Sequence, residues 1–104
     1  MIRQGDILVV PCDTIPQTVA AQAEAGRLIL ARGEATGHHH SIAMSDRVQM
    51  FREDGSGGGL FLIVGAPVAL EHQEHAALTI APGRHEVRRQ REWSDADEPI
   101  QVSD

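Results

Sequence analysis

The chain has few aromatic residues, a single cysteine and no long apolar stretch, and each shortage excludes something. Aromatic residues make up 3% of the 104 residues, so the core of one modest domain has to be built from Val, Ile, Leu and Ala. The single cysteine, Cys12, has no partner for an internal disulfide, so the sequence gives no reason to expect an oxidising compartment. The apolar runs are too short to span a bilayer, and no charged-then-apolar leader opens the chain. We therefore expect a cytoplasmic protein.

Positive charge is also scarce. Nine Lys and Arg residues stand against 15 Asp and Glu residues, which gives a formal net charge of −6. General affinity for nucleic acid depends on a positive surface that displaces the counterions of phosphates. Binding to an anionic membrane surface needs the same kind of charge. The composition therefore argues against both nucleic-acid and membrane partners.

Short β-branched runs bounded by turn residues dominate the chain and predict strands. Expected strands cover residues 7–11, 27–36, 41–44, 48–53, 60–64, 66–70 and 85–93. Gly33 suggests a β-bulge, and the glycine-rich residues 54–59 suggest the connection of a hairpin. The Ala-rich segment 17–26 fits either a helical turn or an exposed loop.

Six or seven short, mainly antiparallel strands predict an all-β fold, either a small β-barrel or a sandwich. We expect one domain over residues 1–93, followed by an acidic and flexible tail over 94–104. Open strand edges and a limited core favour a homodimer.

Histidine is what the chain has in excess, and five of its six histidines fall in two short segments. In the first segment, alternate residues of a strand point the same way, so His38 and His40 should project together while His39 faces the other side. Gly37 before them permits an unusual backbone angle. Two imidazoles offered from one strand indicate a metal site, and the alternative is a solvated, histidine-rich turn.

The second segment, Glu71 to His75, contains two histidines three residues apart. On a continuous strand His72 and His75 would face opposite sides, but at a strand end that runs into a turn they can converge. Three or four imidazole nitrogens suit Zn, Fe, Ni or Cu better than Mg or Ca. Glu71 or Glu74 could orient a ligand or act as a general base. Taken singly, each glutamate also fits an exposed loop.

The last strand carries a further histidine and a basic stretch. With a period of two, His85, Arg89 and Arg91 share one face of this strand. His85 could join the site, although a lone strand histidine is more often a half-buried core residue. Arg89 or Arg91 could bind an anionic substrate. The alternative is that the arginines pair with the surrounding acidic residues.

Three segments, at residues 37–40, 71–78 and 82–93, resemble a family of small uncharacterised bacterial β-proteins. In that family we expect the motifs G-H-x-H, H-x-E-H-x-P-L and P-G-x-Y-x-V-x-x-Q-R-E-Y. Here Ala77 replaces the expected Pro, and His85 and Trp93 replace the two Tyr residues. The resemblance implies no activity. It favours four of the histidines over the remaining two: His38, His40, His72 and His75.

A looser similarity is to the cupin barrel, whose metal site pairs an H-x-H motif with a later P-x-G-x-x-H. The segment from Pro82 to His85 does not match the spacing of the second motif. Asp46 is the acidic residue nearest after the H-x-H. The similarity implies an architecture and no cupin activity.

The sequence leads to a hypothesis of a small β-protein that binds a transition metal, with zinc expected first and Fe, Ni or Cu as alternatives. Its expected ligands are His38, His40, His72 and His75. A coordination position open to water would make the site hydrolytic, with Glu74 or Glu71 as the base.

Two other hypotheses stay open at this level. One is a non-catalytic accessory or protein-interaction module with structural histidines. The other is metal-free acid–base catalysis on an anionic substrate held by Arg89 or Arg91.

Overall fold

The protein is built from ten short strands in the part of the chain that the computed structural model describes, which is residues 1–16, 18–33, 37–53 and 59–89. These residues include no helix that could cross a lipid bilayer. In chain order the strands are β1 (Ile2–Gln4), β2 (Ile7–Pro11), β3 (Thr18–Ala20), β4 (Arg27–Arg32), β5 (His39–Ala43), β6 (Val48–Glu53), β7 (Leu60–Val64), β8 (Val68–Leu70), β9 (Leu78–Ile80) and β10 (Gly83–Arg89).

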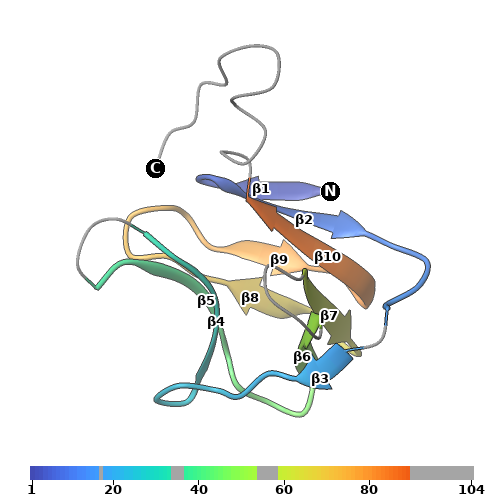
Figure 1. Cartoon of the computed structure of the whole chain (residues 1–104). Coiled ribbons are helices and arrows are strands. Elements are labelled where there is room, and N and C mark those ends of the chain that lie inside the picture. The colour runs from blue at the N-terminus through green and yellow to red at the C-terminus, as the bar shows by residue number, and fades with distance from the viewer. Residues whose placement is uncertain (17, 34–36, 54–58, 90–104) are drawn as a thin grey trace.

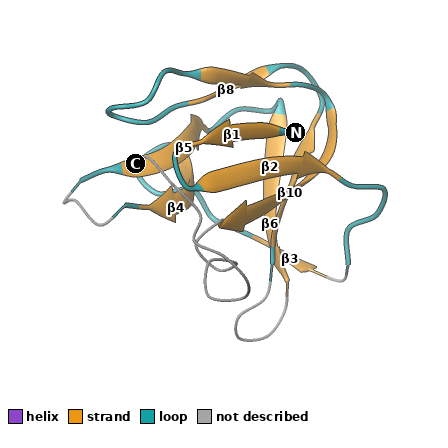
Figure 2. Ribbon diagram, turned by 90° about the horizontal axis from the view of Figure 1, so that it is seen from above, coloured by secondary structure: helices purple, strands orange, loops and turns teal. Residues whose placement is uncertain are grey.

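The strands form three antiparallel sheets that pack together as a sandwich (Figure 1). The largest sheet has the order β1-β2-β10-β7-β6-β3, and β4-β5 and β8-β9 are two-stranded hairpins. In the view of Figure 2, β8 is drawn at the top of the picture, with β1 and then β2 below it. The predicted all-β class is confirmed. The described strands make open sheets, so the sandwich applies and the closed barrel does not.

The core lies between the large sheet and the two hairpins. In β6 the side chains of Val48 and Met50 are buried while Gln49 is exposed, the alternation expected of a half-buried strand. β7 lies between β6 and β10, and its Leu62 is fully buried. Apolar residues of all three sheets join one cluster that includes Leu28, Ile42, Leu70, Ile80 and Val87.

Several predicted strands are confirmed, and β2, β6 and β7 have the predicted bounds. Ten strands replace the expected six or seven because three-residue strands such as β1 and β3 are too short to carry a pattern of their own. The segment 17–26 contributes β3 and a turn at Ala25 and Gly26, where φ is +50° and +78°. The described part of this segment contains no helical turn.

The predicted bulge at Gly33 is wrong. The register of the β4–β5 hairpin shifts between Ile29 and Ala31, so Leu30 is the extra residue. The backbone N–H of Gly33 instead donates to the His38 carbonyl at 2.9 Å and continues the hairpin. Residues 28–31 are all apolar and all buried, so no polar position marked where the bulge lies. The predicted tail over 94–104 and the end of the last strand, 90–93, lie outside the described residues.

Candidate functional site

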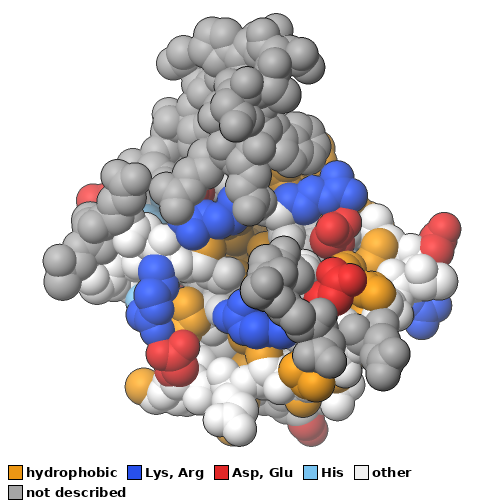
Figure 3. All heavy atoms as spheres, viewed as in Figure 1, with side chains coloured by type: hydrophobic (Ala, Val, Ile, Leu, Met, Phe, Trp, Pro, Cys, Tyr) orange, Lys and Arg blue, Asp and Glu red, His pale blue; other side chains and the backbone are white. Residues whose placement is uncertain are grey.

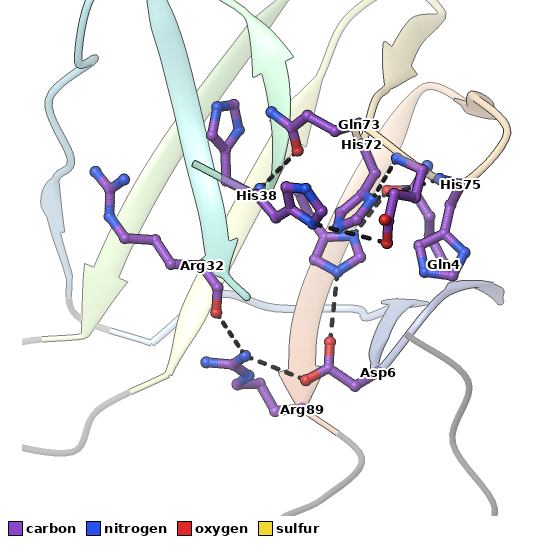
Figure 4. Close-up of polar contacts among 11 residues, drawn as sticks. Gln4, Asp6, Arg32, His38, His72, Gln73, His75 and Arg89 are labelled. Atoms are coloured by element: carbon purple, nitrogen blue, oxygen red, sulfur yellow. Dashed lines mark hydrogen bonds and ion pairs between the residues drawn. The ribbon is translucent and has the colours of Figure 1, made fainter. Parts of the chain in front are cut away.

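The four histidines favoured by the sequence meet in one cluster beside β5 (Figure 4). The His72 ring lies at the middle of the cluster. Its centre is 4.4 Å from that of His40, 4.7 Å from that of His75 and 5.6 Å from that of His38. The rings of His40 and His75 are nearly parallel, with centres 6.1 Å apart. The predicted convergence of the two histidine segments is therefore present in the fold.

His40 is the most buried member, with 1% of its surface exposed. Its ring Nδ1 lies 2.8 Å from Oε1 of Gln4, a residue that is itself buried. The Gln4 amide nitrogen donates to the carbonyls of Leu70 and Ala76, both at 2.9 Å. Because these two bonds fix which end of the amide is nitrogen, Oε1 is an acceptor and Nδ1 of His40 carries the proton. The remaining ring nitrogen, Nε2, faces away from Gln4.

The Gln4 side chain also closes the loop that carries the second histidine segment. Leu70 and Ala76, whose carbonyls it binds, flank that loop on its two sides. Within the loop, the backbone N–H of Glu74 donates to Nδ1 of His72 at 3.0 Å, and that of His75 approaches at 3.4 Å. A neutral His72 ring that accepts at Nδ1 holds its proton at Nε2. His72 therefore shapes the turn as well as the cluster.

A buried carboxylate that the sequence did not single out lies below the imidazoles. Asp6 sits in the two-residue turn between β1 and β2, after Gly5, whose φ of +59° suits the first position of such a turn. Its side chain is 5% exposed, and Oδ1 lies 3.4 Å from Nε2 of His40. Oδ2 accepts a hydrogen bond of 3.1 Å from Arg89, as Figure 4 shows. In the sequence Asp6 carried only the signal of a turn residue.

The outer side of the cluster is formed by His38 and Glu74. Nδ1 of His38 lies 3.7 Å from Oε1 of Glu74, and both side chains are partly exposed. Glu71 is placed differently, because its carboxylate accepts from Arg27 at 2.5 Å and its backbone pairs with Ser41. Of the two glutamates proposed as bases, Glu74 is thus the one in contact with an imidazole.

His39 points away from the cluster, as the strand alternation predicted. Its backbone N–H donates to Oε1 of Gln73 at 2.8 Å. With Ser41 it lines an open groove of about 320 Å³, together with Arg27, Glu71 and His72. His72 is the residue shared by this groove and the cluster. Figure 3 shows only small patches of histidine, at one edge of the face in view.

The remaining predicted residues lie in other settings. His85 is buried and its Nε2 donates to the carbonyl of Ala81 at 2.8 Å, which closes the turn before β10. Arg89 binds Asp6 and the carbonyl of Arg32, at 2.9 Å, through the same nitrogen. Arg91 lies outside the described residues. Cys12 is a poor candidate nucleophile, because burial and, next, the Glu86 carboxylate raise the pKa of its thiol.

The donor atoms of the cluster are not arranged around a common point. Among the described ranges of the chain, no group of three or more His, Cys, Asp or Glu side chains is positioned to hold a metal ion. His72 explains part of this, since its Nδ1 accepts from the backbone and a neutral ring has its proton at the other nitrogen. A ring rotation or a shift of the loop would be needed before three of these residues could bind one ion.

The chain belongs to a family described as Domain of unknown function (DUF8820), whose model matches residues 3–90. The match covers both histidine segments, Gln4 and Asp6, so all the described parts of the cluster lie within the family domain. No curated protein and no solved structure matches the chain.

Proposed function

We propose that this protein binds a transition metal ion at the histidine cluster, with zinc expected first and Fe, Ni or Cu as alternatives. The observation that carries the proposal is the way His40 is held. Gln4 fixes the proton of this buried ring on Nδ1, so in the neutral ring Nε2 is the nitrogen that carries the lone pair a metal can bind. Ligand histidines are commonly oriented by such a bond from the other ring nitrogen.

The spacing of the rings supports the same proposal. Imidazoles that bind one zinc ion at about 2.0 Å have ring centres about 5 Å apart. The separations around His72 and between His40 and His75 run from 4.4 to 6.1 Å. Rings at these distances need rotations and small shifts to share an ion. The sequence also resembles a family with G-H-x-H and H-x-E-H motifs, and these motifs contain the same four histidines.

Metal binding on this account includes a rearrangement of the loop after β8. His72 can become a ligand only when Nδ1 or Nε2 presents a lone pair to the metal, so its ring has to leave the turn or the turn has to change. Two backbone N–H groups of the turn donate to the ring of His72, and neither donates to that of His75. The ring of His75 is stacked with the ring of His40. His40 and His75 are therefore the first ligands in the proposal, and His72 and His38 complete the set.

A hydrolytic activity would follow if one coordination position stays open to water, whose pKa the metal lowers. Glu74 is then the better base of the two predicted. It is 59% exposed at its side chain, beside His38, whereas Glu71 is bound to Arg27. This extension adds a reaction class to the proposal and does not name a substrate.

A second candidate function is an accessory or interaction module in which the histidines are structural. Two observations favour it: the bonds of His40 and His72 within the fold, and an open groove of about 650 Å³ between β5, β8 and the residues before β6. The groove is lined by apolar side chains, including Ile42 and Val68, and by Asp46 and Arg47. In this case the homodimer predicted from the sequence would be one form of partner.

The test is the metal content of untagged protein after reconstitution, measured by elemental analysis beside the His38→Ala/His72→Ala double variant. His39→Ala is the matched control, because this residue belongs to the same triplet and points to the other face. We expect near-stoichiometric zinc in the parent and in His39→Ala, and a loss in the double variant. The absence of metal from a folded parent would leave the interaction module as the better function.

A further inference from the structure

We propose that Asp6 is an oxygen ligand of the same metal ion, which makes the centre a mixed carboxylate–imidazole site. The inference rests on the proposed function, because it assigns one more ligand to the ion held by the histidines. It adds a residue that lies more than 30 positions before the first histidine segment and carries no motif.

The distance between the two donor atoms is the first argument. Nε2 of His40 and Oδ1 of Asp6 are 3.4 Å apart. This separation is at the long end for an N–H···O hydrogen bond and within the range of an ion pair. Two donors that each lie about 2.0–2.1 Å from one tetrahedral zinc ion are about 3.3 Å apart. The pair therefore already has the separation that a shared ion would impose.

The environment of the carboxylate is the second argument. Burying a charged group is costly unless it is paired, and Asp6 is 5% exposed at its side chain. Arg89 binds Oδ2, and the same guanidinium nitrogen is held by the carbonyl of Arg32. Arg89 thus fixes the carboxylate by one oxygen and leaves the other directed at His40. This is the arrangement in which a carboxylate binds a metal through a single oxygen while an outer residue orients it.

The ligand chemistry narrows the choice of metal. Carboxylate oxygen together with imidazole nitrogen suits Zn²⁺, Fe²⁺ and other borderline divalent ions. Soft Cu⁺ is selected by thiolates and thioethers instead. Asp6 therefore favours a divalent ion over a cuprous one within the range that the histidines alone allow.

The experiment is a titration of the full-length protein with Co²⁺, followed by visible absorption, in the parent, Asp6→Asn and Arg89→Gln. Asp6→Asn removes the anionic ligand, whereas Arg89→Gln removes the ion pair and keeps the carboxylate. We expect Asp6→Asn to weaken Co²⁺ binding about tenfold or more and to move the absorption bands. Arg89→Gln should weaken binding less and leave the band positions close to those of the parent.

A purely structural role of Asp6 gives a different result, in which both variants lose affinity equally and the bands of bound Co²⁺ stay unchanged. That outcome, or unchanged affinity in Asp6→Asn, overturns the inference and leaves the histidine site in place. A parent that binds no Co²⁺ overturns the proposed function itself. If Asp6→Asn does not fold, the carboxyl ¹³C resonance of Asp6 in the parent decides, since it must shift with stoichiometric Zn²⁺ and its constancy would refute the ligand role.

Discussion

Leu62 at the centre of the large sheet and His40 in the histidine cluster are equally buried, but the two side chains are held in place by different forces. Leu62 in β7 is 0% exposed and His40 in β5 is 1% exposed. Leu62 is stabilised by apolar surface removed from water, which depends on volume and hardly on direction. His40 requires particular partners, because a buried polar group without one is costly. Two side chains with the same burial therefore differ in what stabilises them. Leu62 needs close packing, whereas His40 needs hydrogen-bond partners at particular positions.

The polar region is also the one built from distant parts of the chain. The hydrogen bonds of Gln4 reach Leu70 and Ala76, 66 and 72 residues away. The β6–β7 hairpin, in contrast, joins neighbours in the sequence. A site assembled in this way depends on the fold being complete, whereas the hairpin can form locally. The predictions below separate the two kinds of burial.

The largest loss of stability is expected for Leu62→Ala. Truncating a fully buried leucine costs about 2–5 kcal/mol, because apolar contacts are lost and a cavity is left. Ile63→Ala is the matched control from the same strand, and its parent side chain is 38% exposed. Chemical denaturation should show a much smaller change for the control. Similar losses in the two variants would contradict the described orientation of β7.

Gln4→Leu is expected to cost about 2–3 kcal/mol although it adds no cavity. It removes the partner of the His40 ring and of the Leu70 and Ala76 carbonyls, of which the first is buried and the second partly buried. Each buried polar group left without a partner costs about 1–3 kcal/mol, part of which water can recover. Denaturation measures the loss, and amide exchange should localise it to residues 70–76. A variant as stable as the parent would show that this clamp does not hold the cluster.

Replacing Arg27 by Gln should change stability by about 0–1 kcal/mol, since exposed ion pairs contribute little. Arg27 binds Glu71 and Ser41 at the edge of the smaller groove, and both charged side chains are partly exposed. The comparison with Glu71→Gln and with the double variant in a thermodynamic cycle gives the pair's own contribution. A coupling energy well above 1 kcal/mol would mean that the Arg27–Glu71 pair contributes as much as a buried polar contact, such as that between Gln4 and His40.

The thiol of Cys12 should react slowly with iodoacetamide. Burial and the Glu86 carboxylate raise its pKa, so less thiolate is present at a given pH than in an unfolded chain. The pH profile of alkylation should have its midpoint above that of the denatured protein. Glu86→Gln should lower this midpoint, because it removes a carboxylate that raises the thiol pKa. Glu53→Gln, at the end of β6, should leave the midpoint unchanged. A native midpoint equal to the denatured one would contradict the effect of burial.

Local patterns predicted much of the fold. Alternation and turn residues marked the β6–β7 hairpin with its bounds, and Gly37 does have the positive φ, +82°, that its place before the histidines suggested. The same alternation predicted that His38 and His40 point together and His39 points away. These features depend on residues close in the sequence, which is why a pattern can reveal them.

The supporting residues of the site could not be predicted in this way. Gln4 immediately precedes the first two-residue turn and Asp6 lies in it, and polar residues at a turn normally face solvent. Their burial follows from β1 packing near β9 and the loop before it, a long-range contact with no periodic signal. The bulge at Leu30 was hidden for a related reason, since an unbroken apolar run shows no change of phase.

The most direct test of the proposed metal centre is the ¹⁵N spectrum of the imidazole rings, recorded with and without one equivalent of Zn²⁺. It reads the state of each ring nitrogen in the intact protein. The account predicts that His40 keeps its proton at Nδ1 while its Nε2 resonance moves to the position of a metal-bound nitrogen, accompanied by His75. It also predicts that His39 and His85 do not change. Unchanged His40 and His75 resonances at saturating zinc would contradict the proposal that these rings form a metal site.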